Sequence, residues 1–122
     1  MRPVLNLRLP YPPSANAIWE VARNRIKLTE RGRLYRREVA MCILNQLGTP
    51  EAIGGPVSVT VEASPPDGRK RDLDNLCKAT LDALTHAKVW GDDSQIKELS
   101  LRWDERSRGG SLNVTIREWE GE

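Results

Sequence analysis

The chain has 122 residues, enough for one domain that buries roughly two-thirds of the surface exposed by its unfolded form. Its apolar fraction of 39% argues against a disordered chain, and no apolar run reaches the roughly 18 residues of a membrane span. We therefore expect a cytoplasmic protein with no membrane partner. The formal net charge of +2 does not by itself predict a nucleic-acid ligand, so the clustering of charges matters more than their sum.

The first quarter of the chain predicts a strand, a stiff loop and a hairpin. Leucines at every second position make residues 4–9 a strand with one buried face. The segment "PYPPSANA" follows, and its prolines predict a turn or an extended loop. Residues 18–28 are interpreted as a short hairpin with its turn near Asn24.

The rest of the chain alternates helices with strands. Thr29 is a suitable N-cap for a helix that reaches Leu47, where Gly48 and Pro50 end it. Alternating valines predict a strand over residues 57–63, and apolar residues at helical spacing predict a second helix that begins at Leu73. Two final strands are expected over residues 95–103 and 111–118, joined by the polar turn "DERSRGGS".

This order, β-α-β-α-β-β, predicts a single α+β domain over residues 1–122. We expect a mixed or mostly antiparallel sheet, with the last two strands forming a hairpin and two helices packed on one face. Such a sheet has exposed edges, and dimerisation could cover one of them.

Several familiar kinds of site are not predicted. Cys42 and Cys77 both fall in amphipathic helices, so we interpret them as buried, reduced thiols rather than a disulfide or a metal pair. His86 is the only histidine, and its spacing places it on the polar side of a helix. The sequence contains neither a Walker loop nor a cysteine–histidine zinc pattern.

Charged residues gather in the stretch "KRDLDNLCKATLDALTHAKVWGDD", from Lys70 to Asp93. Asp72 and Asp74 follow three basic residues (Arg69, Lys70 and Arg71), and Lys78 lies one helical turn after Asp74. Helix capping explains the two aspartates without any chemistry, because carboxylates are favourable at a helix N-terminus. Metal-assisted phosphodiester cleavage is the alternative, since it requires hard oxygen ligands for Mg²⁺, a cation for developing charge, and basic side chains to hold the backbone, and this segment contains all three.

Two motifs carry a resemblance to a known family. The run "RDLDNLCKATLDAL" followed by "VWGDD", together with the proline segment "PYPPSANA", resembles the RusA family of Holliday junction resolvases from bacteria and their prophages. The resemblance covers nearly the whole chain. It implies a homodimer that binds four-way DNA junctions and cuts two opposed strands with Mg²⁺, with Mn²⁺ as a substitute to be tested.

The resemblance also implies roles for individual residues. The metal-binding carboxylates would be Asp72, Asp74 and Asp93, and the essential lysine would be Lys78. Residues expected to contact DNA lie in the proline segment and in the loop before the second helix; they are Ser14, Asn16, Arg69, Lys70, Arg71 and Asn75. The arginines of residues 23–37 would hold further phosphates.

Three questions stay open on the sequence alone. Asp93 follows the far end of a helix about 22 Å long, so it reaches Asp72 only by a straight return or across a dimer. A catalytically silent DNA-binding protein would need the aspartates only as caps. A metal nuclease acting on flaps or RNA would use the same residues on another substrate.

Overall fold

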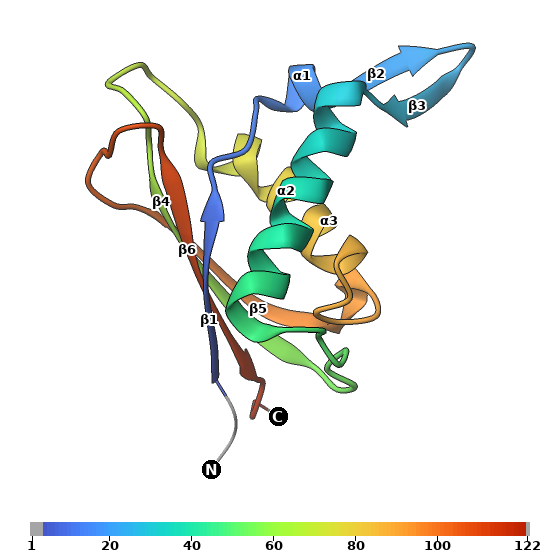
Figure 1. Ribbon diagram of the computed structural model, residues 1–122, viewed down its shortest axis with the longest axis vertical. Helices are drawn as coiled ribbons and strands as arrows, with labels where there is room; N and C mark the ends of the chain where they lie inside the picture. The colour runs from blue at the N-terminus through green and yellow to red at the C-terminus, as the bar shows by residue number, and fades with distance from the viewer. Residues whose placement is uncertain (1–3, 122) are drawn as a thin grey trace.

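The computed structural model describes residues 4–121, which form one mixed sheet covered on one face by helices (Figure 1). The sheet contains β1 (Val4–Pro10), β6 (Ser111–Glu118), β4 (Val57–Ser64) and β5 (Ile96–Trp103), in that spatial order. The β4–β5 pair is parallel, and the other two pairs are antiparallel. The predicted α+β class and mixed sheet are therefore confirmed.

Two long helices, α2 (Glu30–Leu47) and α3 (Leu73–His86), pack against the sheet. The predicted Thr29 cap is confirmed, because its hydroxyl accepts a hydrogen bond from the Gly32 amide. Gly48 ends α2 in the left-handed region at φ 77°, where a residue without Cβ is favoured. Arg36 ties the helices together through two hydrogen bonds to the Asp82 carboxylate, 2.9 and 3.1 Å long.

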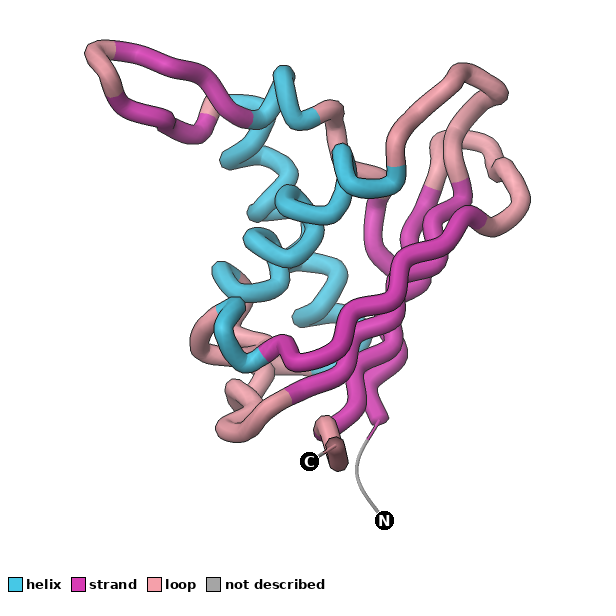
Figure 2. The backbone as a smooth tube through the Cα atoms, turned by 180° about the vertical axis from the view of Figure 1, so that it is seen from behind, coloured by secondary structure: helices cyan, strands magenta, loops and turns pink. Residues whose placement is uncertain are grey.

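The predicted hairpin over residues 18–28 is also confirmed. It consists of β2 (Trp19–Ala22) and β3 (Arg25–Leu28), joined by Arg23 and Asn24. Both turn residues have positive φ, at 53° and 62°, as a tight two-residue turn between twisted strands requires. The hairpin stands away from the main sheet in both views (Figures 1 and 2).

The prediction that the last two strands form a hairpin is wrong. The strand β6 lies between β1 and β4, whereas β5 pairs with the other edge of β4. The reason is visible in burial: Leu112, Val114 and Ile116 of β6 are fully buried and suit a central strand, whereas β5 is largely exposed and suits an edge. The helix α3 connects β4 to β5 and so allows these two strands to pair in parallel. The strand β5 therefore occupies one edge of β4, and β6 pairs with the other edge.

Short helices interrupt two segments that were expected to be irregular. A single helical turn, α1 (Ala15–Ile18), follows the prolines of the segment expected to be a loop. A 3₁₀ turn, η1 (Asp93–Gln95), precedes β5. Both turns are stabilised locally, the first by hydrogen bonds from the Ala17 and Ile18 amides to the Ser14 carbonyl.

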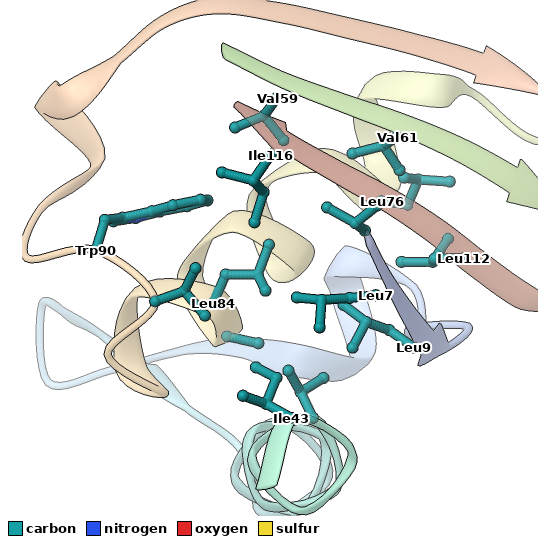
Figure 3. Packing of buried hydrophobic residues seen from close by; sticks show 14 of the residues in the cluster. Leu7, Leu9, Ile43, Val59, Val61, Leu76, Leu84, Trp90, Leu112 and Ile116 are labelled. Carbon is teal, nitrogen blue, oxygen red and sulfur yellow. The ribbon is translucent and has the colours of Figure 1, made fainter. Parts of the chain in front are cut away.

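The core lies between the sheet and the two long helices (Figure 3). Trp90 is fully buried there, and its indole donates a 2.7 Å hydrogen bond to the Thr85 hydroxyl. Cys42 and Cys77 are free thiols as predicted, but both are only partly buried, because each lies at the border of its helix's apolar stripe. His86 is exposed, as predicted. Within residues 4–121, no helix has the length and apolarity that crossing a bilayer requires.

Candidate active site

One end of the molecule carries a cleft of about 1030 Å³, where three segments distant in sequence meet the N-terminus of α3. Figure 2 shows the long loops after β4 and β5 rising at this end. Gly110 of the second loop lies so close to the Tyr11 ring that a Cβ there would be 2.8 Å from the tyrosine Cβ. The cleft is lined by Tyr11, Pro12, Pro13, Ser14, Arg31, Pro66, Arg69, Lys70, Arg71, Asp72, Asn75, Leu76 and Gly109.

Asp72 occupies the N-cap position of α3 without using its side chain as a cap. Its backbone is extended, at φ −97° and ψ 137°, but its carboxylate makes no capping hydrogen bond. Asp74 lies in the first turn of the same helix, and both side chains are exposed. Capping therefore does not account for Asp72, and two carboxylates stand available at the positive end of a helix dipole beside the cleft.

Lys78 lies one turn further along α3, on the same face as Asp74. Its ammonium nitrogen sits over the Trp19 ring, 5.2 Å from the ring centre. This cation–π contact holds the lysine close to the helix surface instead of leaving it to sample solvent. The candidate site's cation thereby contacts the base of the β2–β3 hairpin.

The two aspartates at the start of η1 have different surroundings. Asp92 caps the turn: its carboxylate accepts a 3.0 Å hydrogen bond from the Ser94 amide, and the bonds it accepts from Ser94 hold its pKa below the usual range. The Gln95 side chain accepts a hydrogen bond from the Asp92 amide in return. Asp93 instead accepts a hydrogen bond from the Thr85 hydroxyl, near the C-terminal end of α3. Asp92 therefore stabilises the η1 turn, and Asp93 is the candidate metal ligand of the two.

The three expected metal ligands are not brought together in one chain. Thr85, which binds Asp93, is eleven residues beyond Asp74, or roughly 16 Å of helix. Cys77 lies between them: burial is the main cause that raises its pKa, and the charges of Asp74 and Asp93 raise it further. Among residues 4–121, no three aspartate, glutamate, histidine or cysteine side chains are close enough to hold one metal ion.

Asp67 organises the basic loop, and the sequence interpretation missed it. Its carboxylate accepts hydrogen bonds from the Arg71 guanidinium at 2.8 Å and from the Arg69 amide at 2.9 Å. These bonds, with Arg71 the larger cause, hold the pKa of Asp67 well below its usual range. Arg71 also lies over the Tyr11 ring, 5.8 Å from its centre. The available signal was the "PPDG" turn, because an aspartate there bonds to backbone two residues on.

The remaining expected DNA contacts surround the same end of α3. Ser14, Arg69, Lys70, Arg71 and Asn75 all line the cleft. The Asn75 side chain accepts a 3.4 Å hydrogen bond from the Ala15 amide, which ties the proline segment to α3. Asn16 is exposed on α1 but does not line the cleft.

Comparison with known proteins places the chain in a family. The family model described as endodeoxyribonuclease RusA matches residues 10–117. The chain belongs to the RusA family. Similar relatives include proteins named crossover junction endodeoxyribonuclease RusA from Escherichia coli strain K12, 39% identical, and from Enterobacteria phage 82, 38% identical. Each alignment spans 113 residues, 93% of this chain and 93% of the relative.

Proposed function

We propose that this RusA-family chain is a Mg²⁺-dependent endodeoxyribonuclease that resolves four-way DNA junctions by paired, symmetric cuts. One observation carries the proposal: the Asp72 carboxylate makes no capping hydrogen bond and lines a cleft together with Arg69 and Lys70, while Asp74 lies in the first turn of α3. Arg69 and Lys70 would bind a phosphate, and the carboxylates at the N-terminus of α3 would face that phosphate. The names of the relatives support the substrate class.

The donor set fits a hard divalent ion. Carboxylate oxygens are the ligands that Mg²⁺ prefers, and Asp72 and Asp74 supply them from one exposed helix end. A bound metal would activate water and stabilise the leaving oxygen. Lys78, steadied by Trp19, would place positive charge beside the phosphate on which negative charge develops. Arg69, Lys70, Arg71, Ser14, Asn16 and Asn75 would bind the DNA strand.

A homodimer would complete each site. The hydrogen bond of Asp93 to Thr85, eleven residues beyond Asp74 on α3, supports a composite site, in which Asp93 of one protomer approaches Asp72 and Asp74 of the other. A two-fold dimer also supplies the two symmetric sites that paired cutting needs. Both edge strands, β1 and β5, are available within the described sheet for such an assembly.

The substrate experiment compares synthetic DNA and RNA structures at one salt concentration. Incubation with a four-way junction, a flap duplex and an RNA hairpin, each with and without Mg²⁺, should give cleavage of the junction alone, and only with metal. Mn²⁺ in place of Mg²⁺ tests the breadth of the metal requirement. Binding without cleavage under every condition would favour a catalytically silent DNA-binding protein. Faster cleavage of the flap duplex or the RNA hairpin than of the junction would favour a metal nuclease that acts on flaps or RNA.

A further inference from the structure

The β2–β3 hairpin carries an unusual pair of exposed apolar side chains. Val21 and Ile26 are 76% and 74% exposed and lie directly opposite each other in the strand register. The register puts them on the same face as the Trp19–Leu28 pair, while Glu20 and Lys27 lie on the other. The hairpin thus has one continuous apolar face, anchored at its base and uncovered toward its tip.

The charges of the hairpin indicate what could cover that face. Arg23, Arg25 and Lys27 are opposed only by Glu20, which lies 3.9 Å from the Lys27 ammonium. The hairpin thus carries an apolar face on one side and cations at its tip and on its other side, which matches a ligand that has both flat apolar surfaces and phosphates. Nucleic acid has this chemistry wherever its bases are unstacked. A second copy of the hairpin would cover the apolar face but supplies no phosphates for these cations.

The hairpin is rooted beside the candidate active site. The Trp19 ring at the base of its apolar face lies under the Lys78 ammonium. The Thr29 hydroxyl and amide bond to the carbonyls of Ala17 and Ile18, at 2.6 and 2.8 Å, and close the base of the hairpin. In Figures 1 and 2 the hairpin and the long loops rise at the same end of the molecule, with α1 next to the hairpin. A DNA strand bound at the cleft would therefore pass near the hairpin.

We infer that the Val21–Ile26 face is a wedge that inserts among the bases at the branch point of the junction, while Arg23 and Arg25 hold the neighbouring phosphates. The inference rests on the proposed function and adds a structural basis for choosing junctions over duplex. Apolar side chains that enter between base steps must unstack them, and this costs least where the continuous base stack is already interrupted. A four-way junction offers such a point, whereas a continuous duplex does not.

The test uses the double variant Val21→Thr/Ile26→Thr, because threonine keeps the β propensity of the hairpin while making its face polar. Met41→Gln, on α2, is the matched control, since Met41 is 57% exposed and lies outside the hairpin. All proteins also carry Asp72→Asn to prevent cutting, and they are titrated onto a junction with 2-aminopurine at the branch point. We expect a rise in fluorescence with the parent and the control. The double variant should lose most of that rise and bind the junction about tenfold more weakly, with duplex affinity changed less than about twofold.

Two outcomes would overturn the wedge. One is an equal fluorescence rise and equal junction affinity in the double variant and its parent. The other is a fall in molecular mass of the double variant by light scattering, which would assign the face to a contact between protomers. Junction cleavage by the protein without Asp72→Asn, measured in parallel, tests the proposed function separately. If the protein without Asp72→Asn cleaves the junction but the parent Asp72→Asn protein does not unstack the branch point, the wedge is refuted and the proposed function is not.

Discussion

Asp93 is hydrogen-bonded to Thr85 at one end of α3, whereas Asp72 begins the other end of the same helix. The carboxylates that the family motif groups therefore attach at opposite ends of one helix, and no three such side chains of residues 4–121 form a metal site. If each site takes Asp93 from the partner subunit, mixing two inactive variants should restore partial activity.

The mixing experiment combines Asp72→Asn and Asp93→Asn subunits, each inactive alone. In a composite arrangement, one site of the mixed dimer carries both lesions and the other is intact, so one strand of the junction should be nicked. With both ligands from one chain, both sites would be dead and no nick would appear. Asp92→Asn serves as the control: its capping role predicts a small loss of stability and substantial remaining cleavage.

Lys78 should be needed for cleavage more than for binding. Lys78→Gln removes the charge but keeps a long polar side chain, so we expect a fall in the single-turnover cleavage rate of about a hundredfold or more. Junction affinity should fall by no more than the loss of a single phosphate contact would cause. Trp19→Leu, which removes the ring beneath the ammonium, should slow cleavage by a smaller factor without changing the metal requirement. An unchanged single-turnover rate for Lys78→Gln would exclude this role.

The Asp67 clamp predicts a pH dependence of stability. Hydrogen bonds from Arg71 and Arg69 lower the folded-state pKa of Asp67, so the stabilisation is present above its unfolded pKa of about 3.9 and is lost as pH falls through the folded value. Asp67→Asn should therefore unfold at lower urea than the wild type at pH 7, with the difference shrinking below about pH 4. Glu51→Gln, outside the clamp, should show no such difference. A gap that stays constant from pH 7 to pH 3 would contradict the clamp.

The basic loop predicts steep salt dependence of binding. Each phosphate neutralised on a duplex arm contributes about 0.9 to the slope of log affinity against log salt. Arg69 is the more exposed of the two clamped arginines, so Arg69→Ala should reduce the slope by about one contact. Arg36→Ala should leave the slope unchanged and destabilise the fold, because Arg36 is paired with Asp82 between the helices. A slope unaffected by Arg69→Ala would remove that residue from the interface.

Local features of this chain could be predicted from sequence, and non-local pairing could not. The Thr29 cap, the turn near Asn24 and the α3 face depend on neighbours a few residues apart, so periodicity and turn chemistry suffice. The position of β6 between β1 and β4 depends on residues more than 45 apart in the chain, and strand pattern alone does not fix such partners. The Asp67 clamp was missed because its acceptor geometry depends on how the loop folds. The family motif predicts Asp93 as a ligand, and helix length alone predicts that it starts from the far end of α3.

The most direct test of the account is cleavage of a synthetic four-way junction by Asp72→Asn and Asp74→Asn proteins in Mg²⁺. The Asp72 side chain makes no capping hydrogen bond and both aspartates are exposed, so the variants should stay folded, yet they lack the charge a hard divalent ion requires. We predict that both bind the junction at least as tightly as the wild type and leave it uncut, while the wild type makes paired symmetric cuts. Wild-type cleavage rates in both variants would contradict the central claim.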